Sequence, residues 1–243
     1  MKILLIAGHG QGDPGACGCG YKEAELVREI VVNLKAKLSA YANVDLFDVN
    51  KNMYKFLKAG NLFNFKNYDY VFEIHFNAAV DDTKGDGKTT GTEILVHPSE
   101  KGTAVENAIV RGISSLGFKN RGVKTKSNLQ NMNVCKGKQG VSYALLETCF
   151  VDDKDDMQLY ISKKDAVITA IANGIISGFG LGKTIAEKKV EEVKELTTPN
   201  DIVWQLSQMI EITDTVKAVN DLTRAMNENS SCYWMLKKLA NKR

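Results

Sequence analysis

The chain has 243 residues and a formal net charge of +3 at pH 7, a size that fits one medium domain with a small addition. So small a charge, without an arginine-rich stripe or interleaved aromatic residues, argues against nucleic acid as a partner and mildly favours an anionic polymer such as a cell wall. No apolar run approaches the ~20 residues that span a bilayer, so no membrane association is expected. The N-terminal apolar run has only six residues, too few for a signal peptide, and we expect synthesis in the cytoplasm.

The first elements in the chain are a strand, a loop and a helix. Residues 2–7 predict a buried strand, and residues 8–20 predict a glycine-rich loop. Helical periodicity begins at Lys22 and places Glu23 and Glu25 in the first turn, where the helix dipole favours acidic side chains. The apolar positions of this helix are Leu26, Val27, Ile30, Val31, Leu34 and Leu38.

Four further segments predict strands, at residues 44–49, 69–76, 92–96 and 141–146. The second of them is apolar on both faces, as in the centre of a sheet that is covered on both sides. Helices are predicted at residues 103–116 and from Ser162, where Ser162 and Asp165 form a capping-box pattern. This alternation predicts an α/β fold with a mainly parallel central sheet flanked by helices.

The composition changes after Gly182. Residues 1–182 are expected to form one domain, residues 183–198 a charged linker, and residues 199–243 a small C-terminal helical module. The few apolar residues of this module suggest stabilisation by self-association, and so a homo-oligomer, or a role in wall binding. Its aromatic residues could stack on sugars, although aromatic residues at helical positions are more often core residues; they are Trp204, Tyr233 and Trp234.

Two of the three histidines follow strand-like runs. His9 follows residues 2–7 and His75 follows residues 70–74, and open α/β sheets bind ligands at the carboxyl ends of their strands. Glu23 and Glu147 place two carboxylates in comparable positions. Two histidines and one glutamate are a recurring ligand set of catalytic zinc.

His9, Glu23 and His75 therefore predict a zinc site, with Glu147 as the free carboxylate beside it. Spacing alone leaves open that the histidines are ordinary polar residues at strand ends and that the glutamates are solvated. Glu25 lies close enough to Glu23 to compete as a ligand, although it occupies another face of the helix.

Several segments resemble zinc-dependent N-acetylmuramoyl-L-alanine amidases of the amidase-3 type. The first metal-binding segment is matched by AGHG, DPGA and YKE at residues 7–10, 13–16 and 21–23. FEIHFNA at residues 72–78 resembles the second such segment, and LLETCFV at residues 145–151 resembles the one with the catalytic glutamate. NRGVK at residues 120–124 resembles a segment near the substrate, and the whole resemblance covers residues 1 to about 180.

The resemblance implies hydrolysis of the amide bond between the lactyl group of N-acetylmuramic acid and L-alanine in bacterial peptidoglycan. It makes His9, Glu23 and His75 the ligands of Zn²⁺ and Glu147 the general acid/base. Asn77 is a candidate for supporting the ligands, although a capped strand end explains it equally well, and Arg121 is a candidate for substrate contact.

The resemblance together with the expected lack of a signal peptide suggests a phage endolysin that reaches the wall through a holin. A spore-lytic or autolytic bacterial enzyme is the alternative origin. Two other activities stay open: a zinc peptidase or deacetylase acting on peptidoglycan, and a catalytically inactive wall-binding protein on the same fold.

The chain departs from the family in three places, one of which is the competing Glu25. Cys17 and Cys19 interrupt the first segment, where they could confer redox sensitivity or bind a second metal. However, an odd total of five cysteines favours reduced thiols, and no second pair lies at zinc-finger spacing. The polar loop at residues 80–91, next to His75, is expected to be mobile and to contact substrate.

Overall fold

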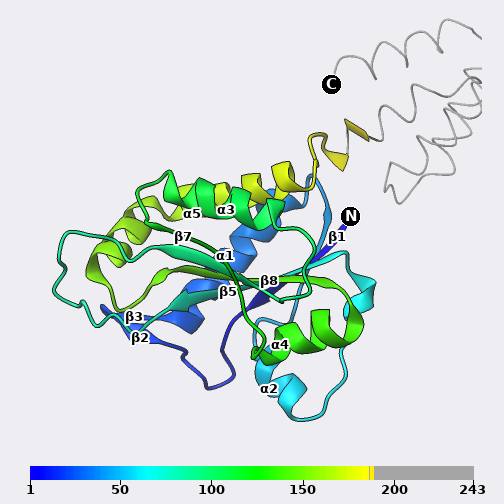
Figure 1. The fold of residues 1–243 in the computed structure, drawn as a ribbon, viewed down its shortest axis with the longest axis horizontal. Helices are drawn as coiled ribbons and strands as arrows, with labels where there is room; N and C mark the ends of the chain where they lie inside the picture. Colours follow the sequence, from blue (N-terminus) through cyan, green and yellow to red (C-terminus); the bar gives the residue numbers. More distant parts are fainter. Residues whose placement is uncertain (186, 189–243) are drawn as a thin grey trace, which may run out of the picture. The chain divides into compact units, whose positions relative to one another are not determined.

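The computed structural model describes residues 1–185 and 187–188, and Met1–Gly182 form one compact unit. Most of the expected linker and the whole C-terminal module, with Trp204, Tyr233 and Trp234, lie outside the described residues. Six strands form one sheet in the order β4-β1-β5-β8-β6-β7 (Figure 1). They are β1 (Lys2–Ala7), β4 (Asn43–Leu46), β5 (Tyr70–Asn77), β6 (Thr92–Val96), β7 (Asn120–Thr125) and β8 (Ser142–Phe150).

Strand direction decides which residues meet at each edge of this sheet. β1 is parallel to β4 and β5, and β5 is parallel to β8, so the prediction of a mainly parallel sheet is confirmed. β6 is antiparallel to β8 and parallel to β7. The carboxyl ends of β1, β5 and β8 therefore share one edge of the sheet with the amino ends of β6 and β7.

Helices cover both faces of the sheet, which is why the central strands are apolar on both sides. α1 (Glu23–Leu38), α3 (Ala104–Ser114) and α5 (Lys154–Gly178) pack on one face (Figure 1). α2 (Met53–Lys58), η1 (Phe65–Asn67), α4 (Gln130–Met132) and η2 (Asn133–Lys138) pack on the other. In β1, Ile3 and Leu5 face the first layer, whereas Leu4 and Ile6 face the second.

A short hairpin leads into α1. β2 (Cys17–Gly18) pairs antiparallel with β3 (Tyr21–Lys22), and α1 begins at the next residue. A Cβ on Gly18 would lie 2.6 Å from the Cα of Asp152, so the hairpin packs closely against the segment that follows β8. This contact fixes where α1 starts relative to the sheet.

The expected helix start at Ser162 is wrong. α5 begins at Lys154, because the Asp153 carboxylate accepts hydrogen bonds from the N–H groups of Asp155 and Asp156. The Ser162 hydroxyl instead donates to the Leu159 carbonyl, and the capping-box pattern coincides with an interruption of the helix at Lys163 (φ −125°, ψ 22°).

Other differences are smaller. β8 continues to Phe150, so Glu147 lies within the strand and not after its end. β7 and α2 were not predicted, because neither has a clear apolar period. Within the described residues, no helix is both long and apolar enough to cross a membrane.

Candidate active site

His9 lies two residues after the end of β1, in a loop that accepts hydrogen bonds from Arg28 of α1. The Arg28 guanidinium donates to the carbonyl oxygens of Gly8 and His9, at 3.1 and 2.9 Å. His9 itself has φ of +57°, which is uncommon for a residue other than glycine. The Arg28 contacts stabilise this conformation and so fix the direction of the imidazole.

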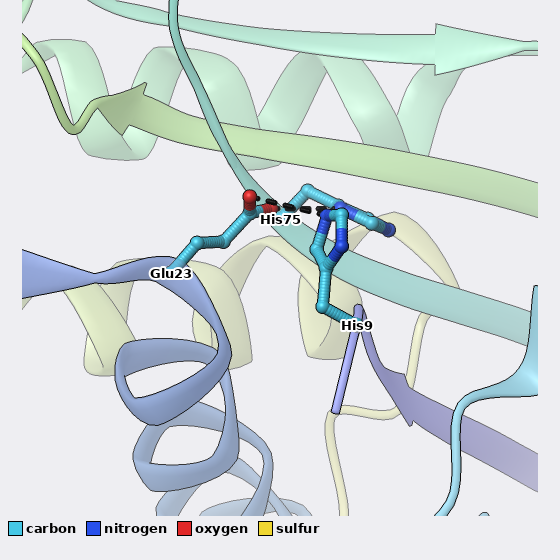
Figure 2. A group of neighbouring side chains, drawn as sticks. All are labelled: His9, Glu23 and His75. Atoms are coloured by element: carbon cyan, nitrogen blue, oxygen red, sulfur yellow. Dashed lines mark hydrogen bonds and ion pairs between the residues drawn. The ribbon is translucent and has the colours of Figure 1, made fainter. Parts of the chain in front are cut away.

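Glu23 is the first residue of α1, and its carboxylate is buried. Its Oε1 accepts a hydrogen bond from the Phe76 N–H at 2.9 Å, and its Oε2 accepts one from the Ala16 N–H at 2.8 Å. The carboxylate thus faces both imidazoles (Figure 2). Oε2 is 3.1 Å from His9 Nε2, and Oε1 is 2.8 Å from His75 Nδ1.

The second ring nitrogen of each histidine contacts another carboxylate. His9 Nδ1 lies 3.0 Å from Asp13 Oδ2, and His75 Nε2 lies 2.9 Å from Glu73 Oε1. These pairs orient both rings so that His9 Nε2 and His75 Nδ1 face Glu23. Metal-binding histidines commonly have such a carboxylate partner.

Both supporting carboxylates are themselves hydrogen-bonded. The Asn131 amide donates to both oxygens of the buried Glu73, at 3.0 and 2.9 Å, and the Tyr143 hydroxyl donates to Glu73 Oε2. Asp13 accepts hydrogen bonds from the Asn52 amide at 3.1 Å and from the backbone N–H of Gly15 at 3.0 Å. Each imidazole is therefore oriented by a carboxylate that is itself held in place by further hydrogen bonds.

The residues fit a zinc ion. His9, Glu23 and His75 each offer a ligand atom, and these atoms lie within 4.8 Å of one another. Glycines leave the space that the group needs: a Cβ on Gly15 would lie 2.6 Å from Glu23 Oε2, and one on Gly8 would lie 2.4 Å from the His75 ring. The structure thus brings together the three residues that the sequence indicated, in the donor set of catalytic zinc.

Glu25 does not join this group. Its side chain is 71% exposed and pairs with Lys22 at 3.2 Å. The helical geometry that places Glu23 inward turns Glu25 to solvent.

The three ligand candidates perturb one another's pKa. Burial alone would raise the pKa of Glu23, but hydrogen bonds with His75 and His9 outweigh it and hold this pKa well below its usual range. Burial alone would lower the pKa of His75, but hydrogen bonds with Glu23 and Glu73 raise it well above its ordinary value. Without metal the group is a set of buried ion pairs, so zinc would have to displace protons in order to bind.

Glu147 lies beside this group on β8. It is the register partner of His75 on β5 and of Glu93 on β6, so the three side chains share one face of the sheet. Burial raises the pKa of Glu147 to about 7; the charges of Glu23 and Glu93 add to this rise, and that of His75 opposes it. Its Oε2 is buried and has no hydrogen-bond partner within the described residues.

A network around Glu93 contains both remaining candidates. The Asn77 amide donates to Glu93 Oε1 at 3.2 Å, which places Asn77 on the face of the sheet that carries the site. Arg121 Nε donates to Glu93 Oε2 at 2.7 Å, and Lys124 Nζ also contacts this oxygen. The Arg121 guanidinium lies 4.8 Å from the centroid of the Phe150 ring. Asn77 and Arg121 are thus coupled through a carboxylate that sequence reasoning did not single out.

A pocket of about 310 Å³ is lined by both histidines. Besides the site residues, it is lined by Asn52, Tyr54, Leu129, Gln130 and Leu145. Asn52 and Tyr54 come from the α2 segment, which the sequence did not mark as functional.

The loop at residues 80–91 contacts the start of α5. The Asp152 carboxylate accepts hydrogen bonds from the N–H groups of residues 79–81, and Asp155 accepts them from Asp86 and Gly87. The carboxylates of Asp82, Asp86 and Asp155 approach within 4.8 Å, although exposed acidic groups are common without an ion. A substrate contact by this loop stays a prediction.

The cysteines of the described chain form no disulfide. Cys17 is exposed, and Cys19 is partly buried. Burial and the nearby charge of Asp153 raise the pKa of Cys19, which makes its thiolate scarce at neutral pH. Neither thiol belongs to a group of potential metal ligands in the described residues.

Comparison with known proteins identifies relatives of the whole α/β unit. The profile of the family described as N-acetylmuramoyl-L-alanine amidase matches residues 3–177. "Probable autolysin PH" of Staphylococcus aureus is 28% identical over 214 residues, which cover 82% of this chain and 43% of that protein. "Endolysin" of Bacillus phage SPP1 is 30% identical over 186 residues, covering 72% of this chain and 64% of that protein. The chain therefore spans less than two thirds of the length of these relatives.

Solved structures show the same fold. The catalytic domain of the CD27L endolysin targeting Clostridia difficile matches with a TM-score of 0.58 and 23% identity, covering 73% of this chain and 97% of that chain. The amidase AmiC2 of Nostoc punctiforme matches with a TM-score of 0.59 and 21% identity, covering 74% and 97%.

Proposed function

This chain belongs to the N-acetylmuramoyl-L-alanine amidase family, and we propose that it is a zinc-dependent amidase of bacterial peptidoglycan. The bond cleaved is the amide between the lactyl group of N-acetylmuramic acid and L-alanine. The observation that carries the proposal is the group of His9, Glu23 and His75 beside Glu147, a carboxyl whose pKa is raised to about 7.

The chemistry divides among these residues. Zinc held by His9, Glu23 and His75 would polarise the amide carbonyl and lower the pKa of water to about 7. Glu147 accepts a proton from water at Oε2 as the C–O bond forms. It returns the proton to the departing nitrogen of L-alanine as the C–N bond breaks. A carboxyl with a pKa near neutrality suits both transfers.

The surrounding residues keep this geometry. Asp13 and Glu73 orient the two imidazoles, and the backbone N–H groups of Ala16 and Phe76 hold the Glu23 carboxylate. Because these contacts exist before any substrate binds, little reorganisation is needed during the reaction.

Digestion of purified peptidoglycan tests the reaction. An amidase releases peptides with new L-alanine amino termini and creates no new reducing sugars. Mass spectrometry of the products should show intact glycan and free stem peptides. Peptides cleaved at another bond, or deacetylated sugars, would replace the proposed activity with that of a peptidase or a deacetylase.

Metal content tests the zinc assignment. His75→Ala removes one ligand and should abolish most of the zinc bound by the purified protein. His97→Ala is the matched control, because the His97 ring hydrogen-bonds with Ser99 and lies outside the site. Equal zinc content in wild type and His75→Ala would overturn the assignment.

We also propose that the protein acts as an endolysin, and the similarity to the phage SPP1 protein supports this role. Expression inside a host should leave the cells intact, and co-expression with a holin should lyse them. Lysis without the holin would contradict release through a holin.

A further inference from the structure

We propose that the site binds its substrate in one orientation. The uncharged muramyl sugar occupies the pocket beside α2, and a carboxylate of the stem peptide binds Arg121 and Lys124 on β7. This inference rests on the proposed function and deepens it.

The β7 side of the site carries excess positive charge. Arg121 and Lys124 both pair with the single carboxylate of Glu93, so the three side chains sum to one net positive charge. Only Nε of Arg121 is used in this pair, and its terminal nitrogens make no hydrogen bond within the described residues. The Arg121 side chain is 26% exposed and that of Lys124 is 44% exposed, so a solute can reach both. A guanidinium that is already fixed by a carboxylate and an aromatic ring is pre-organised to bind a second carboxylate.

The lining of the pocket beside α2 lacks such charge. No lysine or arginine lines the pocket of about 310 Å³, and the carboxylates of Asp13 and Glu73 lie within it. Together with the Glu23 carboxylate these outnumber the two imidazoles of His9 and His75, so an anion is disfavoured there. Tyr54 lines this pocket and is 44% exposed, with Lys58 Nζ 5.3 Å from its ring centroid. An exposed aromatic ring suits a sugar, because the apolar face of a sugar packs on an aromatic face.

The fold keeps the two sides apart. In the sheet order, His9, His75 and Glu147 follow or lie on the neighbouring strands β1, β5 and β8. β7 lies at one end of the sheet, and β4, which precedes α2, lies at the other. α2 is itself anchored to the His9 loop, because the Asn52 amide donates to Asp13 and Lys55 Nζ donates to the Gln11 carbonyl.

The substrate has a matching polarity. On one side of the scissile amide is an N-acetylated sugar without charge, and on the other is a peptide with free carboxylates. If the peptide carboxylates bind Arg121 and Lys124, the neutral sugar lies in the pocket beside α2. The opposite orientation would place carboxylates next to Asp13 and Glu73.

Binding of paired soluble muramyl peptides tests the carboxylate half of the proposal. The two ligands differ only in whether the α-carboxyl of the second stem residue is free or amidated. Calorimetry is done on the full chain in a Glu147→Ala background, so that the ligands are not consumed. The free acid should bind more tightly. Arg121→Gln should reduce this preference about tenfold, and Lys124→Met should reduce it about two- to fivefold.

The variants are chosen so that a change in ligand binding cannot be attributed to misfolding. Each single substitution leaves Glu93 one cationic partner, and thermal melts confirm the fold. Lys66→Met removes the same charge in η1, which precedes the end of β5 opposite to His75, and should leave the preference unchanged. An unchanged preference in Arg121→Gln and Lys124→Met would overturn the carboxylate site.

The sugar half is tested by comparing muramyl peptides with lactyl peptides that lack the sugar. Tyr54→Ala should weaken muramyl binding about two- to tenfold and leave lactyl binding unchanged, whereas Tyr54→Phe should retain it. Leu62→Ala, another exposed apolar residue near α2, is the control. If Tyr54→Ala instead changed the carboxylate preference, the orientation would be reversed. Peptidoglycan hydrolysis by the wild type is measured separately, so a failure of the proposed function is distinguishable from a wrong orientation.

Discussion

Glu73→Ala should weaken zinc binding although it replaces none of the three proposed ligands. Glu73 is 4% exposed, and its carboxylate accepts hydrogen bonds from His75 Nε2, the Asn131 amide and the Tyr143 hydroxyl. Truncation leaves all three donors without their acceptor, at about 1–3 kcal/mol for each buried group. Because such losses are not additive, we expect a total of about 3–5 kcal/mol in the free energy of unfolding.

The loss of orientation should appear in the metal affinity. A carboxylate that supports a metal-binding histidine typically contributes about 10- to 100-fold to affinity. Competition with a chromophoric chelator measures the zinc Kd, and urea denaturation of the metal-free protein measures stability. Glu73→Gln keeps an acceptor oxygen and the side-chain shape, so it should lose less of both quantities.

Glu106→Ala is the control that distinguishes a loss of zinc affinity from a general loss of stability. Glu106 is also buried, at 3% exposed, and accepts a hydrogen bond from the Tyr70 hydroxyl at 2.8 Å, but it belongs to α3 and not to the site. It should lower stability and leave the zinc Kd unchanged. A folded Glu73→Ala protein with a zinc Kd within about twofold of wild type would refute the reasoning.

Four further predictions concern the same site and the tail. Glu147→Ala should retain the fold and zinc but lower kcat about 10²- to 10⁴-fold; activity within a few-fold of wild type would assign the proton transfer to another group. In the metal-free protein the Glu147 carboxyl should titrate near 7, protonated below and ionised above, and zinc should lower this pKa by its positive charge. Infrared titration would check it, and a midpoint near that of an ordinary glutamate would contradict it. Gly15→Ala should abolish zinc binding because its Cβ would meet the Glu23 carboxylate, whereas Gly12→Ala, also at positive φ but with open space around it, should only lower the melting temperature. Residues 1–182 should fold alone and hydrolyse soluble muropeptides, with a larger loss on intact walls; equal activity of both forms on walls would leave the tail without an anchoring role.

Local patterns were enough to single out His9, Glu23 and His75 as candidate ligands, because each lies next to a strong local signal. The apolar runs before His9 and His75 mark two strands that turn out to be neighbours in the sheet. Glu23 coincides with the first residue of a helix whose apolar period is regular. With parallel strands, these two ends meet at one edge, so the proximity of His9 and His75 follows from local patterns, whereas their role as ligands was implied by the family resemblance.

The β7 side of the site could not be predicted in this way. Glu93 and Arg121 lie near the amino ends of β6 and β7. In an all-parallel sheet they would lie at the edge opposite to His75. Only the antiparallel pairing of β6 with β8 brings them beside Glu147, and nothing in the local pattern of β6 states its direction. Strand direction is thus the piece of long-range information that decides which charges surround the Glu147 carboxyl.

Glu73 illustrates a different limit. Side chains alternate along a strand, so its position two residues before His75 already places it on the same face, and the sequence contains that signal. However, a carboxylate in an apolar run ordinarily argues for an exposed face, since burying an unpaired charge is costly. Asn131 and Tyr143, which are 58 and 70 residues away in the chain, satisfy that charge. Because their contribution depends on the packing of α4 against β8, the role of Glu73 follows from the tertiary structure and not from its neighbours in sequence.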